Sequence, residues 1–220
     1  MFSGLGKHPV LKFLCLAGLG LWIALWYYPP QQWPLFEARP APALWFDEWV
    51  PFQPGWALIY QSVFLTHLAA VWLPSDRGAV WRYTLVLGAV YTAAAFVFWF
   101  YPTLSPRPGV VESRLYYWLV TAVDGERNAM PSLHAAMGTL AALQVDCHAR
   151  AVRAHPFWRL SIGGWWMVFL YSTLATRQHR VLDLVAGVLL VLALLSLWRR
   201  VLQPRPNVPK SPAAELLPTD

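Results

Sequence analysis

Charged residues are scarce in this sequence. Of its 220 residues only 13% are Asp, Glu, Lys or Arg, whereas 57% are apolar; about a quarter of the residues of an ordinary soluble domain are charged. The apolar residues come in blocks about 20 residues long, which is the length that crosses a bilayer. A soluble core of this size cannot bury so much apolar surface. The composition therefore excludes a water-soluble globule and predicts a membrane protein.

Cysteine is also rare, because Cys15 and Cys147 stand alone and far apart. Their spacing excludes a disulfide framework and a cysteine-ligated metal or redox site. The chain has no carboxylate cluster of the kind that Mg²⁺ or Mn²⁺ needs, so we expect no metal and no cofactor. Lys and Arg outnumber Asp and Glu by 17 to 11, but they form no basic run or basic helix face. Nucleic acid is therefore not an expected partner.

Six apolar segments are predicted to be membrane-spanning helices. They cover residues 10–28, 57–73, 80–101, 131–147, 157–175 and 181–198. No small-residue cleavage site follows the first segment, so we expect a retained span and not a signal peptide. The expected fold is all-α: a six-helix membrane domain over residues 1–202, followed by a proline-rich, disordered tail over 203–220.

The basic residues predict the orientation of this bundle. With the N-terminus inside, eleven of the 17 Lys and Arg residues fall on the cytoplasmic side and six on the other. Because short cytoplasmic loops carry the excess of basic residues, both termini are expected to be cytoplasmic. The two long connectors, 29–56 and 102–130, then face outward from an inner (plasma) membrane.

Three short segments hold most of the polar residues that folding in a membrane does not require. They are residues 101–108, 128–134 and 172–183, and the predicted topology brings all three to the outer face. His179 and Asp183 are four residues apart, so on a helix they share one face and the carboxylate can orient the imidazole. The fourth and sixth spans begin at the same face, where their free N–H groups attract an anion.

The other polar side chains suit a phosphate ester. Arg107 and Arg177 offer fork-shaped guanidinium groups that match phosphate oxygens. Ser132 follows Pro131, which favours a first helical turn, and can cap the fourth span or bind an anion. His134 is placed to protonate a leaving oxygen. The set predicts phosphoryl transfer without a metal, because arginine and helix ends neutralise the phosphoryl group.

These segments resemble the three signature motifs of the type 2 phosphatidic acid phosphatase (PAP2) superfamily, K-x6-R-P, P-S-G-H and S-R-x5-H-x3-D, over residues 107–183. The resemblance implies that His179 is the nucleophile, forming a phosphohistidine, and that Asp183 orients it. It also implies that His134 protonates the leaving alcohol, while Arg107 and the Ser132 region hold the phosphate. The implied partners are a lipid phosphate substrate and the surrounding membrane lipids.

The sequence departs from these motifs at three positions. Phe100, Leu133 and Thr173 stand where the motifs have Lys, Gly and Arg. Two phosphate-binding cations are lost, and Arg177 is the expected partial replacement. The Pro-Ser-Leu-His and Arg-Gln-His variants look most similar to the inositol phosphorylceramide synthase-like branch, in which some members transfer a headgroup between lipids. The resemblance thus implies a lipid phosphate phosphatase or phosphotransferase, with hydrolysis expected and transfer as the alternative.

Two other classes of protein stay open. A haem-binding electron carrier would use His134 and His179 as axial ligands, and a transporter or proton channel would use Asp183 as its intramembrane carboxylate. Away from the three segments, His67 is expected to be a packing residue. A solvated loop is expected to contain Arg114, Asp124, Glu126 and Arg127.

Overall fold

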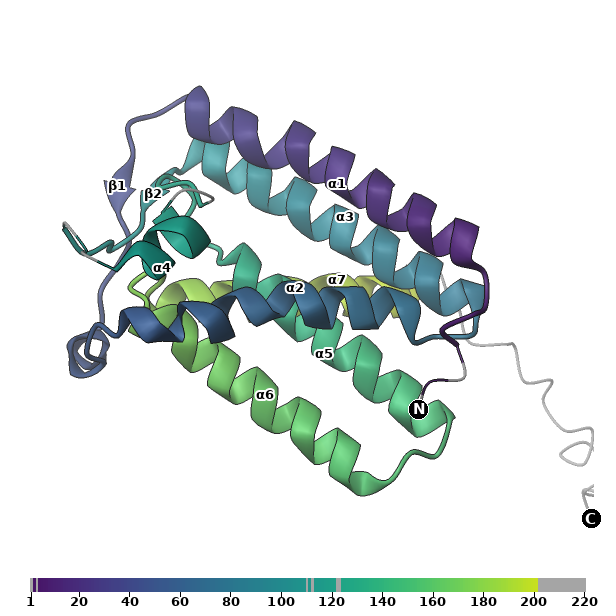
Figure 1. The fold of residues 1–220 in the computed structure, drawn as a ribbon. Coiled ribbons are helices and arrows are strands. Elements are labelled where there is room, and N and C mark those ends of the chain that lie inside the picture. The colour runs from purple at the N-terminus through teal and green to yellow at the C-terminus, as the bar shows by residue number, and fades with distance from the viewer. Residues whose placement is uncertain (1, 3, 110, 112, 122–123, 202–220) are drawn as a thin grey trace, which may run out of the picture.

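Long helices dominate the computed structural model, which describes residues 2, 4–109, 111, 113–121 and 124–201 (Figure 1). They are α1 (Pro9–Gln32), α2 (Ala57–Trp72), α3 (Arg77–Phe100), α5 (Leu133–Ala151), α6 (Pro156–Ala175) and α7 (Val181–Val201). Each overlaps one of the six predicted segments, so the all-α class is confirmed. The predicted tail over 203–220 lies outside the described residues.

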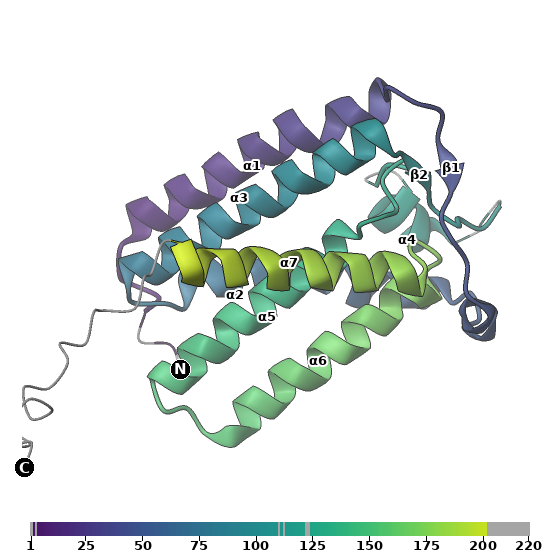
Figure 2. The ribbon, with the colours of Figure 1, turned by 180° about the vertical axis from the view of Figure 1, so that it is seen from behind.

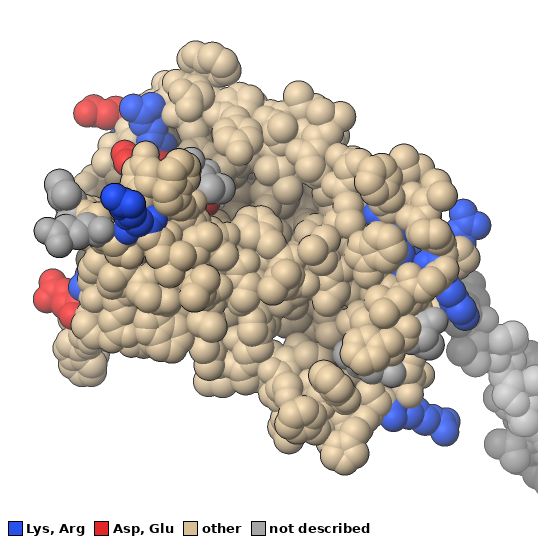
Figure 3. Space-filling model, viewed as in Figure 1, with Lys and Arg blue, Asp and Glu red and all other residues tan. Residues whose placement is uncertain are grey.

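Three of these helices are long and apolar enough to cross a membrane. They are Pro9–Gln32, Arg77–Phe100 and Val181–Arg199, with mean hydropathies of 1.8, 1.7 and 2.5. Figure 3 shows that, on the face drawn, charged side chains gather at the two ends of the bundle and leave an uncharged belt between them. Both observations indicate an integral membrane protein. That α2, α5 and α6 also cross the bilayer stays a prediction.

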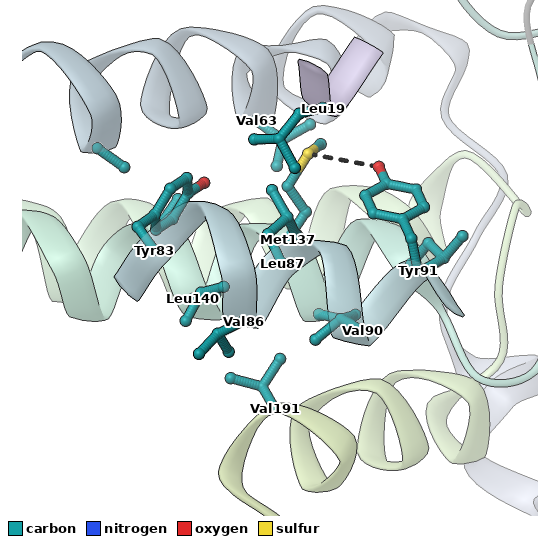
Figure 4. Close-up of a cluster of buried hydrophobic side chains, with 14 of the residues drawn as sticks. Leu19, Val63, Tyr83, Val86, Leu87, Val90, Tyr91, Met137, Leu140 and Val191 are labelled. Carbon is teal, nitrogen blue, oxygen red and sulfur yellow. Dashed lines mark hydrogen bonds between the residues drawn. The ribbon is translucent and has the colours of Figure 1, made fainter. Parts of the chain in front are cut away.

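Helix α5 lies at the centre of the bundle. It packs against α2, α3, α6 and α7, while α1 packs along α3 (Figures 1 and 2). Its sequence is rich in alanine, and small residues let neighbouring helices approach closely. Figure 4 shows Met137 of α5 beside Tyr91 of α3, whose hydroxyl donates to the Met137 sulfur at 3.8 Å. The central position explains why α5 is less apolar than α1 and α7: its neighbours shield it from lipid.

The two long connectors lie together at one end of the bundle, opposite the start of α1 and the end of α7 (Figures 1 and 2). Strand β1 (Arg39–Pro40) of the first connector pairs in parallel with β2 (Thr103–Leu104) of the second. The same connectors contain the 3-10 helices η1 (Trp45–Trp49) and η2 (Pro54–Trp56), the short helix α4 (Arg114–Tyr116) and a π-helical turn, η3 (Tyr117–Thr121). The expectation that the connectors share one face is therefore confirmed.

Candidate active site

Two histidines that are distant in the sequence lie beside each other at the connector end. The ring centroids of His134 and His179 are 6.0 Å apart, and the ring planes are inclined at 51°. His134 belongs to the first turn of α5, and His179 lies in the loop between α6 and α7, two residues before Val181 begins α7. Both rings line one small cavity, together with Tyr27, Tyr60, Ser105, Asp124, Gly125, Asn128, Leu133 and Gln178. The fold thus brings together the two imidazoles that the sequence singled out.

The His179 ring is oriented mainly by the backbone. Its Nδ1 atom lies 3.0 Å from the Ala129 carbonyl oxygen; because a carbonyl only accepts, Nδ1 carries the hydrogen and Nε2 keeps its lone pair. The Asp183 carboxylate is 3.8 Å from Nδ1, beyond hydrogen-bond length, and instead accepts from the Arg180 N–H at 2.8 Å. The expected carboxylate–imidazole hydrogen bond is therefore replaced by one to a carbonyl. The Asp183 side chain is fully buried next to the ring.

The His134 ring has a different set of partners. Its Nδ1 atom lies 3.0 Å from the Tyr60 hydroxyl, and this hydroxyl donates to Oδ2 of Asp124 at 2.5 Å. Since the hydroxyl hydrogen goes to Asp124, the oxygen accepts from Nδ1 of His134. The Nε2 atom of His134 is buried and has no hydrogen-bond partner among the described residues. It lies 3.9 Å from Oδ1 of Asp124.

Asp124 is a site residue that the sequence reasoning missed. The expectation that it belongs to a solvated loop is wrong, because its side chain is only 11% exposed. Arg107 holds this part of the connector: its Nη2 donates to the carbonyl oxygens of Asp124 and Gly125 at 2.6 and 2.9 Å. The one available signal was that Asp124 directly follows the short apolar stretch 115–123. Only the return of the connector over α2 brings the carboxylate to Tyr60.

The two arginines expected to bind phosphate are placed differently from that expectation. Nη2 of Arg107 donates to the two connector carbonyls, and its Nη1 lies 3.4 Å from a Glu126 carboxylate oxygen. Its Nε is buried and has no partner within the described residues, but Arg107 is not among the residues that line the histidine cavity. Arg177 donates to the Val50 carbonyl at 3.1 Å and does not line the histidine cavity. The described contacts therefore do not make Arg177 a replacement for the missing cations.

The start of α5 is available to an anion. Ser132 is its N-cap, since the hydroxyl oxygen accepts from the Ala135 N–H at 3.1 Å, and this confirms the expected cap. Within the described residues, the N–H groups of Leu133 and His134 have no acceptor. Unpaired N–H groups at a helix N-terminus, together with the helix dipole, favour a bound phosphate.

The start of α7 is not available in the same way. Its Val181 N–H donates at 2.9 Å to the carboxylate of Asp47, which comes from η1 in the first connector. The Arg180 N–H is bound to Asp183. The expected anion site at the sixth span is therefore wrong, because two carboxylates of the chain itself satisfy these donors. No local pattern in the sequence pairs Asp47 with Val181.

A buried hydrogen-bond chain fixes the loop before His179. Gln178 donates through Nε2 to the Tyr116 hydroxyl at 2.7 Å, and this hydroxyl donates to the Thr176 carbonyl at 2.8 Å. Burial raises the pKa of Tyr116 above its ordinary value, so the hydroxyl stays protonated and keeps both roles. The second connector thereby supports the backbone that carries His179.

The crossing of α5 and α7 sets the distance between the two histidine segments. The Ser132 N–H donates to the Asp183 carbonyl at 2.9 Å. One helical turn further along α7, a Cβ atom added to Gly187 would lie 2.3 Å from the Ser132 carbonyl oxygen. Only a glycine therefore lets the helices approach this closely.

The substitution Gly187→Ala is expected to destabilise the folded protein by about 1–3 kcal/mol, because the new methyl group meets backbone that cannot rotate away. Thermal unfolding of the detergent-purified protein measures this as a lower Tm. Gly164→Ala is the matched control, since a Cβ at Gly164 of α6 meets nothing within 4 Å. Equal melting temperatures for the two variants would show that the crossing tolerates a side chain.

Comparison with known proteins agrees with this geometry. Residues 31–197 match the PAP2 superfamily. Because the match covers most of the chain, the protein belongs to the PAP2 superfamily, and membership implies phosphatase or phosphotransferase activity on phosphate esters. The match is to the superfamily and gives no evidence for the inositol phosphorylceramide synthase-like branch. No curated protein and no solved structure matches the chain.

Proposed function

We propose that this protein is an integral-membrane lipid phosphate phosphatase that acts without a metal, through a phosphohistidine on His179. The observation that carries the proposal is the pair of imidazoles, 6.0 Å apart, in which each Nδ1 is engaged by another group. The Nε2 atom of each ring is then left for the reacting phosphate. The site lies on the extracytoplasmic side, with both termini in the cytoplasm and six spans in the bilayer of the plasma membrane.

The first step forms the phosphoenzyme. Nε2 of His179 attacks phosphorus while the bond to the leaving alcohol breaks, and His134, protonated at Nε2, gives its proton to the leaving oxygen. The positive charge that develops on the His179 ring faces the Asp183 carboxylate, 3.8 Å away. In this proposal the free N–H groups at the start of α5 bind the phosphoryl oxygens. Arg107 is a further candidate ligand through its unpartnered Nε.

The second step restores the enzyme. His134, now neutral, takes a proton from water; the water oxygen attacks phosphorus, and the bond to Nε2 of His179 breaks. Inorganic phosphate and the original protonation states result. With a lipid hydroxyl in place of water, the same step transfers the phosphoryl group, which is the alternative reaction. PAP2 membership implies chemistry on phosphate esters and therefore favours an enzyme over a haem-binding carrier or a transporter.

A second cavity supports a lipid as the substrate. It has a volume of about 240 Å³ and shares four lining residues with the histidine cavity: Tyr27, Asp124, Leu133 and His134. The remaining lining comes from Ile23, Tyr28, Phe64, Tyr91 and Met137. Apolar walls that continue from a phosphate site fit an amphiphile, whose tail follows its headgroup into the bundle.

The direct test uses purified protein in EDTA and a panel of lipid phosphates: phosphatidic acid, phosphatidylglycerol phosphate and undecaprenyl diphosphate. Free phosphate and new headgroup lipids are both measured. We expect phosphate release in the chelator. Activity that disappears in EDTA and returns with a divalent ion would contradict the metal-independent mechanism, and new headgroup lipid without free phosphate would assign the protein to transfer.

Filling the second cavity is expected to affect long-chain substrates selectively. Ile23→Trp places a larger side chain in the cavity wall and should lower kcat/KM for a long-chain lipid phosphate about 10-fold, with a short-chain, water-soluble phosphate ester unaffected. Leu21→Trp is the matched control, since Leu21 of the same helix is 63% exposed and lies outside the cavity. Equal losses on both substrates would show that the cavity does not hold the lipid tail.

A further inference from the structure

His134 is the end of a chain of three residues that are largely shielded from solvent. Its ring stacks on Tyr60, with centroids 4.3 Å apart and planes at 29°, and the two side chains also share the 3.0 Å hydrogen bond. Tyr60 is 1% exposed and passes its own hydrogen to Asp124 at 2.5 Å. The three residues come from α5, α2 and the second connector. The chain therefore exists only because these elements converge at the site.

The carboxylate of Asp124 lies at a position where a negative charge is unfavourable. A buried negative charge next to a phosphate-binding cavity repels the substrate unless a positive group offsets it. Among the described residues, Oδ2 has the Tyr60 hydrogen, and Oδ1 is 3.9 Å from the unpartnered Nε2 of His134. A proton on Nε2 would therefore place a positive charge 3.9 Å from the carboxylate, which is within ion-pair range although too long for a hydrogen bond.

We propose that Asp124, acting through Tyr60, is a positioning residue that holds His134 with Nδ1 toward Tyr60 and a transferable proton on Nε2. This inference rests on the proposed function, in which His134 is the proton donor. The proton leaves Nε2 for the leaving oxygen in the first step and returns from water in the second. Asp124 and Tyr60 keep their own protonation states throughout, so no further reactant is needed.

The leaving group of the substrate distinguishes a positioning role of Asp124 and Tyr60 from a purely structural one. An alkyl phosphate must expel an alkoxide, which needs a proton, whereas an aryl phosphate such as p-nitrophenyl phosphate expels a stable phenolate without one. A variant that has lost only its oriented proton donor forms the phosphoenzyme slowly from the alkyl ester and normally from the aryl ester. A variant with a distorted site is slow with both.

The experiment measures the rate of phosphoenzyme formation by rapid quench in a single turnover, with an alkyl lipid phosphate and with p-nitrophenyl phosphate. For Asp124→Asn and Tyr60→Phe, we expect about 10- to 100-fold slower phosphorylation by the alkyl ester and unchanged phosphorylation by the aryl ester. Two variants are used, and a Tm measurement of each shows whether its folding is disturbed.

Tyr83→Phe is the matched control. Tyr83 of α3 makes a similar buried bond to a histidine, with its hydroxyl 2.7 Å from Nδ1 of His67 on α2, but this pair lies outside the histidine cavity. Tyr83→Phe should leave the rates of phosphoenzyme formation from both esters unchanged. Slowing of both esters in the Asp124 and Tyr60 variants, or of neither, would overturn the positioning role. If the unmodified protein forms no phosphoenzyme from either ester, the proposed function itself fails, and this role fails with it.

Discussion

Replacing His179 with alanine is expected to lower turnover by at least about 10⁴-fold, because it removes the proposed nucleophile. Among the described residues that line the cavity, the other imidazole is His134, which has its Nδ1 bound to Tyr60 and is the proposed proton donor, so we expect no replacement for His179. The loss should appear in kcat, with substrate binding through the start of α5 retained.

The measurement combines turnover with trapping of the phosphoenzyme. A phosphohistidine is labile in acid and stable in base, so labelled substrate should leave a base-stable label on the unmodified protein and none on His179→Ala. His155→Ala is the control, because this ring accepts a hydrogen bond from the Phe157 N–H at 3.2 Å at the start of α6, away from the site. A label of the same lability on His179→Ala would place the nucleophile elsewhere.

Asp183→Asn is expected to lower kcat by about 10²- to 10³-fold. The amide oxygen still accepts from the Arg180 N–H, so the change removes the charge and keeps the shape. Opposite unit charges about 4 Å apart contribute about 4 kcal/mol at an effective dielectric constant near 20, which sets about 10³-fold as the ceiling. Because the Ala129 carbonyl continues to hold Nδ1 of His179, the productive tautomer survives and the loss stays below that of His179→Ala.

Steady-state kinetics of the two variants, side by side, test this ordering. Asp146→Asn serves as the control, since Asp146 pairs with Arg150 and Arg159 and exposed ion pairs contribute little. A loss as large as that of His179→Ala would mean that Asp183, and not the Ala129 carbonyl, fixes the tautomer. Unchanged turnover would remove Asp183 from the site.

The helical segments were predictable because their signal is local. A run of about 20 apolar residues by itself predicts a helix, and the structure has a helix over each of the six segments. Local spacing also placed Ser132 as the cap of α5. The expected topology put both connectors at one face, and the structure places them there; their pairing through β1 and β2 was not predicted.

The failures concern partners that the sequence does not place next to each other. From the sequence, Asp124 is interpreted as a loop carboxylate. In the structure, the second connector brings it to Tyr60, 64 positions earlier in the chain. From the sequence, Arg177 is interpreted as a phosphate ligand. In the structure, it donates to the Val50 carbonyl of the first connector. From the sequence, the start of α7 is interpreted as an anion site. In the structure, its Val181 N–H donates to the Asp47 carboxylate.

The sequence by itself thus determined the membrane character and the six helical segments, and it singled out the two histidines of the candidate site, since hydropathy and motif spacing act over a few turns of chain. The tertiary structure alone decided which donor meets which acceptor: the Ala129 carbonyl for His179, and Tyr60 for His134. The physical reason is that a buried polar group must find a hydrogen-bond partner wherever packing offers one, and packing brings together residues that no local pattern connects.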